Sequence, residues 1–289
     1  MDRGRPTTTC DSSRRRERRR AGPNRTQDWR RALDRQREPL PTRVDVTPPL
    51  PAAYHRALET GLQEIGVELG GAQRTAIDGH VRLLLAWNES INLTGIRDPE
   101  AVALGHVVDS LTALPVLRER GACRFVDLGS GGGFPGLPVA AALPADGALL
   151  VDSVAKKVRF LDAAVAAVGM AGTIATFTGR AEHLARDPEH RERWQAVLAR
   201  AVAALPELVE LSFPLLAPGG VLIAWKRADV SAELTAATRA TDVLGGGTVE
   251  TTDVSVTGLA GHRLVIITKT GPTPERFPRD PAVRRRSPW

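Results

Sequence analysis

The sequence predicts an α/β protein whose core is a Rossmann-like, doubly wound sheet of about seven strands. Two observations carry this prediction. From residue 124 onward, short β-rich apolar runs alternate with helical patterns, and the first run leads directly into a glycine-rich loop. Five strand–helix units in succession are typical of a parallel sheet. The last two runs have no helix between them, which predicts an antiparallel hairpin at the sheet edge.

Local residue patterns set the expected limits of the strands and of the helices between them. The strands are expected over residues 124–128, 148–152, 173–178, 196–199, 221–225, 248–256 and 263–268. The helices between the first five strands include 154–168 and 205–215, where apolar residues recur at helical spacing. The first strand is therefore the start of a strand–loop–helix unit of the kind that binds ligands.

The segment ahead of the sheet is predicted to be helical. Apolar residues from Leu58 to Leu69 recur at helical spacing, and a second such pattern covers 77–87 after a pair of glycines. A third helix is expected over 99–117, with Asp98 as its N-cap and Pro99 in its first turn. These helices define an N-terminal helical cap over residues 51–120, followed by the sheet domain over 121–270.

The two ends of the chain carry its basic character. Residues 1–50 hold 14 arginines against seven acidic residues, together with several prolines and little apolar periodicity. This composition predicts a disordered Arg-rich extension over 1–50. Residues 271–289 form a basic C-terminal tail. The net charge of +6 therefore belongs to the ends, and it is weak support for nucleic-acid binding by the body of the protein.

Composition excludes several classes of protein. The chain has 289 residues, 42% of them apolar, which is enough for a real core. No window of 18 apolar residues predicts a membrane span, and the first 30 residues lack the apolar region of a signal peptide. Cys10 and Cys123 are too few for a disulfide framework or a four-ligand zinc site. We therefore expect a cytoplasmic protein with no membrane partner and no metal.

The strongest local signal is the run Phe125-Val126-Asp127-Leu128-Gly129-Ser130-Gly131-Gly132-Gly133-Phe134-Pro135-Gly136. A glycine loop between a strand and a helix lets backbone approach a ligand closely. The loop could also belong to a dinucleotide site of the G-x-G-x-x-G type. If that motif starts at Gly129, however, Phe134 stands at its last glycine position, where the helix must pack closely against the strand. Asp127, at the strand end, suits a ligand with a cationic amino group better than a pyrophosphate. A tight turn without ligand remains the alternative.

Two later strand ends add candidate ligand contacts. Asp152 ends the second strand, where a carboxylate can accept hydrogen bonds from both ribose hydroxyls of a nucleoside. Its alternative role is to cap the following helix. Gly179-Arg180-Ala181-Glu182 follows the third strand, and its backbone N–H groups suit adenine. Alone, Glu182 is equally consistent with an acid in the first turn of a helix.

The absence of certain residue types at the predicted strand ends narrows the range of reactions that the sequence supports. No cysteine ends a predicted strand, so covalent addition to a pyrimidine is unsupported. The fourth strand runs into Arg200-Ala201, not into the Asn/Asp-Pro-Pro-aromatic segment that organises methylation of exocyclic amines. His106, Asp109 and Ser110 share one helix face, where a hydrogen-bonded structural cluster is favoured over an acid–base set.

These residues, in this order, resemble the bacterial RsmG family, also called glucose-inhibited division protein B. The resemblance covers residues 54–270 and includes Trp87–Thr94, His106–Ser110, the glycine loop, Asp152–Leu161, Gly179–Glu182 and Arg200–Ala203. It implies an S-adenosylmethionine-dependent methyltransferase domain over 121–270. The implied activity is methylation of guanosine N7 in the decoding region of 16S rRNA, with naked rRNA or a small-subunit precursor as partner.

The resemblance also implies cofactor contacts. It assigns S-adenosylmethionine to Gly129, Phe134, Ala181, Glu182 and Arg200, and the ribose argument adds Asp152. Catalysis is expected to rest on positioning alone. Gly105 and Arg227 depart from the family pattern, where a basic residue and a glycine are usual. The alternatives are a small-molecule methyltransferase on the same sheet and a nicotinamide-dependent oxidoreductase.

Overall fold

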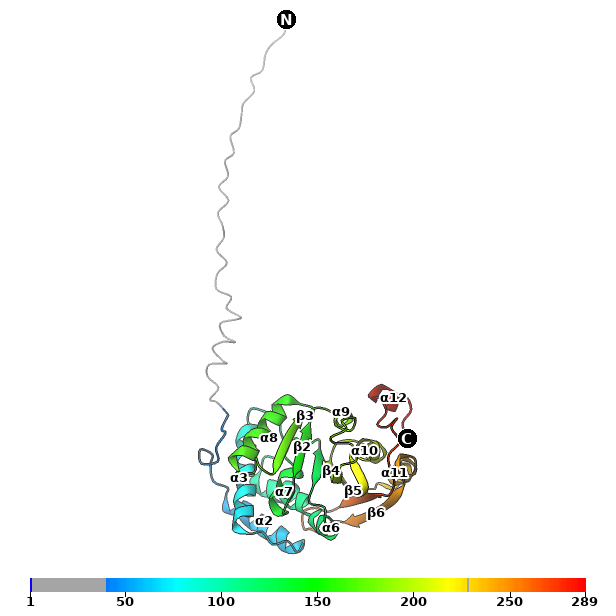
Figure 1. Cartoon of the computed structure of the whole chain (residues 1–289). Helices are drawn as coiled ribbons and strands as arrows, with labels where there is room; N and C mark the ends of the chain where they lie inside the picture. Colours follow the sequence, from blue (N-terminus) through cyan, green and yellow to red (C-terminus); the bar gives the residue numbers. More distant parts are fainter. Residues whose placement is uncertain (2–39, 228) are drawn as a thin grey trace. The chain divides into compact units, whose positions relative to one another are not determined.

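A computed structural model describes Met1 and residues 40–227 and 229–289. Its centre is a seven-stranded sheet in the order β3-β2-β1-β4-β5-β7-β6 (Figure 1). The strands are β1 (Phe125–Leu128), β2 (Ala148–Asp152), β3 (Ile174–Thr178), β4 (Trp194–Arg200), β5 (Leu216–Arg227), β6 (Gly247–Asp253) and β7 (His262–Lys269). Strands β1 to β5 are parallel, and β7 is antiparallel to both β5 and β6. The predicted α/β sheet and its antiparallel edge hairpin are confirmed.

Alternation along the strands builds two separate cores. In β1, Phe125 packs into one apolar cluster and Val126 and Leu128 into the other, because successive side chains of a strand point to opposite faces. The first cluster includes α3 (Gly71–Asn88), α7 (Gly136–Ala142) and α8 (Ala155–Ala167). The second includes α10 (Leu205–Ser212) and α11 (Ser231–Leu244). Figure 1 shows these two sets of helices on opposite sides of the sheet.

The predicted helix over 99–117 is interrupted. It consists of α4 (Pro99–Val102), a π-helical turn η1 (Ala103–Val108), α5 (Asp109–Leu111) and α6 (Leu114–Glu119). Asp98 caps its start as expected, since the carboxylate accepts from the Ala101 N–H at 2.8 Å. Pro115 lies in the first turn of α6, where its missing N–H would have no partner within the helix. The preceding helix therefore ends just before α6. The run Pro99–Glu119 is apolar enough to span a membrane by length and composition, but 61% of its 18-residue apolar window is buried inside the fold.

Residues 40–50 pack against the helical region, although the sequence placed them in the extension. The Trp87 indole donates to the Pro41 carbonyl at 2.6 Å, and Arg82 Nε donates to the Pro48 carbonyl at 2.9 Å. Leu40, Val44 and Leu50 pack on the first apolar cluster. The compact unit spans Leu40–Trp289. The proline-rich composition of this segment did not predict that it packs on the fold, because its contacts depend on α3, which lies later in the chain. The rest of the predicted extension, 2–39, lies outside the described residues.

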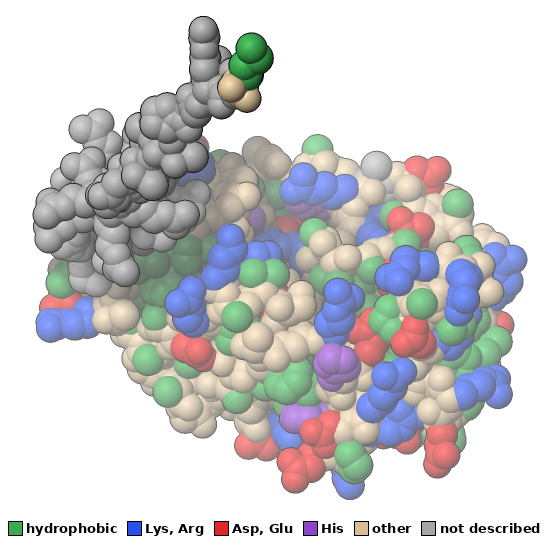
Figure 2. Space-filling model, turned by 90° about the horizontal axis from the view of Figure 1, so that it is seen from above, with side chains coloured by type: hydrophobic (Ala, Val, Ile, Leu, Met, Phe, Trp, Pro, Cys, Tyr) green, Lys and Arg blue, Asp and Glu red, His purple; other side chains and the backbone are tan. Residues whose placement is uncertain are grey.

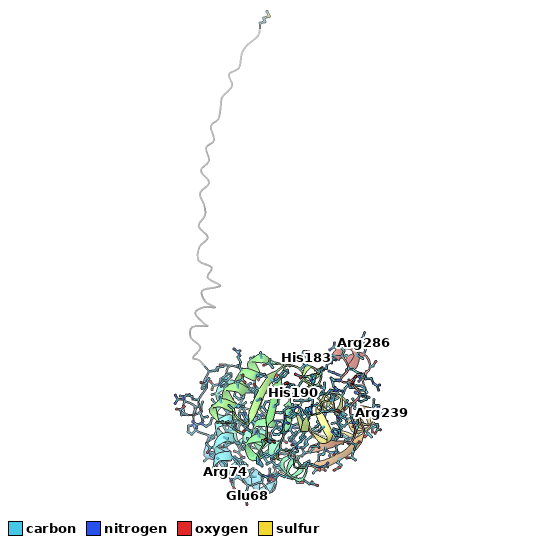
Figure 3. The ribbon with its side chains drawn as sticks, in the orientation of Figure 1. Glu68, Arg74, His183, His190, Arg239 and Arg286 are labelled. Carbon is cyan, nitrogen blue, oxygen red and sulfur yellow. The ribbon has the colours of Figure 1, made fainter. Side chains whose placement is uncertain are left out.

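Two other helices of the compact unit differ from a simple reading of the sequence. Before the sheet, α2 (Ala52–Glu64) ends well short of Leu69. After the sheet, α12 (Pro281–Arg286) forms within the predicted basic tail, and its Asp280 cap accepts from the Ala282 N–H at 2.7 Å. Figure 3 shows Arg286 of α12 at the same end of the molecule as His183 of α9 (Ala181–Leu184), opposite Glu68 and Arg74. The last segment of the chain therefore returns to the edge where the parallel strands end.

Candidate functional site

The glycine loop after β1 is held between two neighbouring segments. Gly129 and Gly133 have φ angles of +73° and +87°, which L residues with side chains rarely adopt. A Cβ at Gly129 would lie 2.7 Å from Val202 Cγ2, and one at Gly133 would lie 2.7 Å from His80 Nε2. His80 also bonds the Gly132 carbonyl at 2.7 Å. The loop therefore needs glycine both for its backbone conformation and for its close neighbours.

The Asp127 carboxylate bonds to the glycine loop and to the start of α7, and it does not face a cavity. Its carboxylate accepts from Ser130 Oγ at 2.5 Å and from the Gly136 N–H at 2.9 Å. The side chain is fully buried, and burial raises the pKa of the Asp127 carboxyl to about 6, against the opposing effect of these two hydrogen bonds. Asp127 therefore fixes the turn into α7 and is not among the residues that line the neighbouring cavities.

A cavity of about 400 Å³ lies at the carboxyl ends of β1, β2 and β3, and we call it the strand-end cleft. Gly129, Asp152, Ala181 and Glu182 line it, as do Lys157, Arg180, Ala201, Ala203, Glu207 and Arg284. Four of the six predicted contacts are thus brought together, although they come from the glycine loop, the end of β2 and the start of α9. This is the position in a doubly wound sheet where ligands bind.

Asp152 links the glycine loop to the segment that follows β2, and its role toward the ribose stays a prediction. One carboxylate oxygen accepts from the Gly131 N–H at 3.0 Å, and the other accepts from the Val154 N–H at 2.8 Å. The residue is only 6% exposed. Each carboxylate oxygen can accept a second hydrogen bond, so Asp152 organises two loops and still has acceptors for a ligand.

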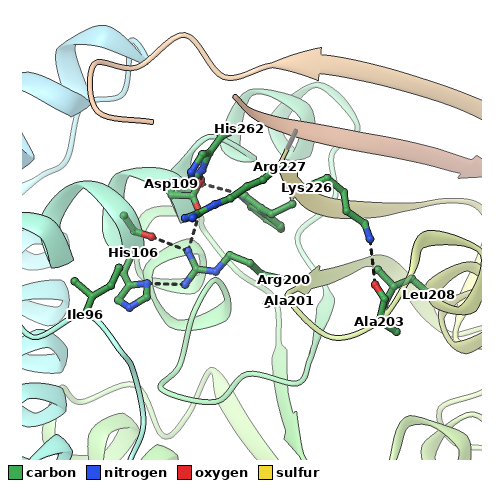
Figure 4. Close-up of a pocket in the computed structure, with 12 residues that line it drawn as sticks. Ile96, His106, Asp109, Arg200, Ala201, Ala203, Leu208, Lys226, Arg227 and His262 are labelled. Atoms are coloured by element: carbon green, nitrogen blue, oxygen red, sulfur yellow. Dashed lines mark hydrogen bonds and ion pairs between the residues drawn. The ribbon is translucent and has the colours of Figure 1, made fainter. Parts of the chain in front are cut away.

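A second cavity, of about 440 Å³, lies beside the strand-end cleft, and we call it the histidine cavity (Figure 4). It is lined by Ile96, Gly105, His106, Asp109, Arg200, Ala201, Ala203, Leu208, Trp225, Lys226, Arg227 and His262. Arg200 donates to Asp109 Oδ2 at 2.8 Å and to His106 Nδ1 at 3.0 Å, and Asp109 Oδ1 lies 2.9 Å from His262 Nδ1. A buried network of charge therefore surrounds Arg200.

His106 is held as a neutral imidazole. Burial, with the positive charge of Arg200 adding to it, lowers the pKa of His106 to about 3. Arg200 donates to Nδ1, so Nε2 carries the hydrogen and faces Thr94 Oγ1 at 2.6 Å. The ring stacks on Phe134 at 4.7 Å. The side chains of His106 and Asp109 are joined through Arg200, whereas Ser110 Oγ donates to the His106 backbone carbonyl at 2.5 Å.

Phe134 and Arg200, the other two predicted cofactor contacts, lie away from the strand-end cleft. Phe134 packs between His80 and His106, with ring centroids 4.6 and 4.7 Å away. The Arg200 guanidinium lies 5.6 Å from the Phe134 ring and lines the histidine cavity. Their assignment to the cofactor stays a prediction.

The loop after β4 separates the two cavities, because Ala201 and Ala203 line both. Ala201 has a φ of +57°, an uncommon conformation for a residue with a side chain. Lys226 donates to the Ala203 carbonyl at 3.1 Å and to Glu233 at 2.7 Å, and Glu233 also accepts from the Leu205 N–H at 2.7 Å. These bonds attach the loop between the two cavities to β5 and α11.

Sequence reasoning missed Trp225, His262 and Arg284 as site residues. Trp225 donates to the Asp109 carbonyl at 2.7 Å, and His262 contacts the same residue through its ring. Arg284 ion-pairs with Glu182, which lies 102 residues earlier in the chain. No local pattern could identify these residues, because their partners are about 100 or more positions away in the chain.

Comparisons with known proteins agree with this architecture. The family model of rRNA small subunit methyltransferase G (GidB) matches residues 73–259. The chain is 39% identical over 228 residues to the ribosomal RNA small subunit methyltransferase G of Halalkalibacterium halodurans, covering 78% of this chain and 95% of that protein. The Deinococcus deserti protein of the same name is 40% identical over 235 residues, covering 80% and 94%.

Among solved structures, an O-methyltransferase from Bacillus cereus in complex with SAH matches with a TM-score of 0.50. It is 14% identical in sequence, and the match covers 66% of this chain and 91% of that one. At this identity the similarity shows a shared fold.

Proposed function

The chain belongs to the rRNA small subunit methyltransferase G family, and on that premise we propose that it transfers a methyl group from S-adenosylmethionine to guanosine N7 in the decoding region of 16S rRNA. The observation that carries the proposal is the adjacency of two cavities. The strand-end cleft and the histidine cavity share Ala201 and Ala203 in their walls. Methyl transfer requires a donor site and an acceptor site that meet at one point.

The residues of the strand-end cleft fit S-adenosylmethionine. Asp152 offers carboxylate acceptors to the ribose, and the backbone at Gly129 approaches without a side chain. Ala181 and Glu182 line the cleft beyond β3, where the adenine is expected. When bound, this cofactor supplies an electrophilic methyl group on a sulfonium centre. The cleft's mixture of polar groups and small residues suits such a zwitterionic nucleoside.

Guanine N7 needs little acid–base help from the protein. It carries an in-plane lone pair and no proton, so positioning is the main requirement. His106 is neutral near pH 7 because its pKa is about 3, and its Nδ1 is already engaged by Arg200. We therefore expect the single-turnover rate of methyl transfer to be flat from about pH 7 to about pH 8.5. A rate that rises with a single ionisation in this range would contradict the proposed mechanism.

The charge of the histidine cavity suits an RNA acceptor. Arg200, Lys226 and Arg227 all line it; the first two are paired with Asp109 and Glu233, whereas Arg227 is exposed at the end of β5. Cationic side chains attract the phosphate backbone of RNA. Figure 2 shows no single basic surface outside the grey region: Lys and Arg are mixed with Asp and Glu on the face seen from above. Recognition is therefore proposed to depend on this cavity more than on bulk charge.

The predicted division of the chain has a role in this proposal. Residues 51–120 supply His106 and Asp109 to the histidine cavity, and residues 121–270 supply the loops of the strand-end cleft. The RNA and the cofactor would therefore bind to surfaces that both parts of the chain supply. Because that substrate is ribosomal RNA, we propose that the protein acts in the cytoplasm.

The test is methylation of small ribosomal subunits taken from cells that lack this modification. Radiolabelled S-adenosylmethionine should label 16S rRNA, and reduction followed by aniline should cleave the chain at the methylated guanosine, because 7-methylguanosine is labile to this treatment. Naked 16S rRNA and assembled subunits form separate arms. A methyl group on N1, N2 or a 2′-oxygen would contradict the N7 assignment.

Two controls address the alternative functions. S-adenosylhomocysteine should bind in calorimetry and NADH should not, which separates methyl transfer from a nicotinamide-dependent oxidoreductase. Labelling of small metabolites in place of the rRNA would support the small-molecule methyltransferase.

A further inference from the structure

The C-terminal segment is fixed to the rim of the strand-end cleft by three buried or half-buried ion pairs. Arg284 of α12 pairs with Glu182 of α9 and, at 3.2 Å, with Glu207 of α10. Arg279 contacts Glu210 through its side chain at 2.6 Å and through its backbone N–H at 2.7 Å. Each acidic partner belongs to one of the two helices that border the cleft.

The end of the chain completes this attachment. The Trp289 indole donates to Glu210 at 2.7 Å, and the Arg279 guanidinium lies 4.6 Å from the Trp289 ring. Arg191, from the loop before β4, donates to the Phe277 carbonyl at 3.0 Å and to the Thr273 carbonyl at 3.1 Å. The segment 277–289 is therefore held along its whole length, and we call it the C-terminal strap.

Arg284 is the residue of the strap that reaches the cleft. It is 8% exposed, it lines the strand-end cleft together with Glu182 and Glu207, and it also lines a neighbouring cavity on the strap side. Its guanidinium donates from Nε to Glu207, from Nη1 to the Arg279 carbonyl at 2.9 Å, and from Nη2 to Glu182. Three directions of the planar group are thus fixed, which arginine can provide and lysine cannot.

The state of Glu182 depends on this partner. Glu182 is 5% exposed, and burial alone would favour its neutral form. The hydrogen bond and charge of Arg284 outweigh burial and hold the pKa of the Glu182 carboxyl below its usual value. The charged groups around it are Arg284 from α12, Arg180 from its own loop, Glu207 from α10, and Asp152 and Lys157 on the other side of the cleft.

We propose that Arg284 is a positioning residue for the cofactor: from the C-terminal strap it holds Glu182 ionised and fixed at the adenosine end of the strand-end cleft, and the strap closes that end. The inference rests on the proposed function, because it takes the ligand of this cleft to be S-adenosylmethionine. It gives the last 13 residues of the chain a part in the cofactor site, where the sequence predicted only a basic tail.

The test is calorimetry of S-adenosylhomocysteine with the full chain and with Arg284→Gln. The substitution should raise the dissociation constant at about pH 7.5 by about tenfold, because a buried carboxylate loses its partner. Arg286→Gln, on the same helix but exposed, is the matched control and should change it less than about twofold. Arg284→Lys should give an intermediate value, since it keeps the charge and loses the fixed geometry.

A pH profile distinguishes positioning from a general loss of stability. In the unmodified protein Glu182 is ionised throughout pH 6 to 8, so its contribution to affinity is constant. In Arg284→Gln, burial is opposed only by Arg180 and a backbone hydrogen bond, so the pKa of Glu182 rises and affinity should fall more steeply as the pH is lowered from 8 to 6. Glu182→Gln/Arg284→Gln removes the titrating group and should restore the original slope. Asp127 is present in all three proteins and contributes equally.

A measurement on the unmodified chain keeps the proposal testable if Arg284→Gln does not fold. Addition of S-adenosylhomocysteine should slow hydrogen exchange of the amides of residues 277–289, because the strap closes on the occupied cleft. Equal affinity and equal pH slopes in Arg284→Gln, or unchanged exchange of the strap, would overturn the inference. If the unmodified protein itself does not bind S-adenosylhomocysteine, the proposed function fails instead.

Discussion

The strand-end cleft and the histidine cavity share a wall but are built in different ways. The cleft is formed by loops that directly follow β1, β2 and β3, and its carboxylate Asp152 bonds backbone N–H groups within 21 residues. The histidine cavity depends on Asp109, whose partners Arg200 and His262 lie 91 and 153 residues away. The part of the cleft around Asp152 is therefore organised by local chain geometry, whereas the histidine cavity and the rim of the cleft at Glu182 depend on long-range pairing of buried charge.

This difference predicts how each cavity responds to substitution. Loss of a group in the cleft removes a ligand contact while neighbouring backbone bonds persist. Loss of Asp109 leaves Arg200 and His262 without their common partner in a buried environment, which penalises the whole fold. Substitutions in each region, and a deletion outside both, put this contrast to the test.

The largest effect is expected for Asp109→Asn. Asp109 is 1% exposed and pairs with both Arg200 and His262. Removing its charge should lower the free energy of unfolding by about 3–5 kcal/mol, measured by urea denaturation. Asp253→Asn, which breaks an exposed pair with Arg263, should cost less than about 1 kcal/mol. Equal midpoints for the two variants would show that the network around Arg200 is not a structural requirement.

The next effect concerns the cleft. Asp152→Ala should weaken binding of S-adenosylhomocysteine by about 1.5–3 kcal/mol, the scale of hydrogen bonds to a charged group. Its effect on unfolding should be smaller than that of Asp109→Asn. Asp146→Ala, at the opposite edge of the sheet, should leave the affinity unchanged. If the folded Asp152→Ala variant binds normally, Asp152 only organises the loops beside it.

Acid sensitivity is expected from both regions. Burial lowers the pKa of His80 to about 4 and that of His106 to about 3, so both stay neutral in the folded protein well below neutral pH. In the unfolded chain a histidine titrates near about pH 6.5, so the unfolded state takes up protons first. Stability should therefore fall as the pH drops from about 7.5 to about 5.5, by about 1.4 kcal/mol for each histidine.

His80→Gln and His106→Gln isolate these contributions. Each variant should lose its own share of the pH dependence, measured as the difference between unfolding free energies at the two pH values. Asp127 acts in the opposite sense, because its raised pKa of about 6 lets the folded state take up a proton first. It is common to all the proteins compared. A variant with the full pH dependence would show that the replaced histidine is protonated in the fold.

The smallest effect is expected at the N-terminus. Among the described residues, none that lines either cavity precedes Ile96. Deleting residues 2–39 should therefore leave thermal stability and S-adenosylhomocysteine affinity unchanged. Deleting 2–50 should cost at least about 1 kcal/mol, because Trp87 and Arg82 lose their partners Pro41 and Pro48. If the deletion of residues 2–39 abolished folding, this would contradict the assignment of the compact unit to Leu40–Trp289.

Short stretches of the sequence are sufficient to specify the sheet, the glycine loop and most of the strand-end cleft. Strand periodicity, the turn into α7 and the carboxylate at the end of β2 are properties of such segments, and parallel strands bring their ends to one edge whatever the rest of the chain does. Gly129, Asp152, Ala181 and Glu182 could therefore be assigned to one site from the sequence, and they do line one cleft.

The histidine cavity, the packing of residues 40–50 and the attachment of the basic tail depend instead on tertiary contacts. His262 meets Asp109, and Arg284 meets Glu182, because the sheet order and the returning C-terminus bring distant segments together. An arginine in a sequence looks the same whether it faces solvent or a buried glutamate. The difference lies in the desolvation of both charges, which depends on neighbours that local sequence does not specify.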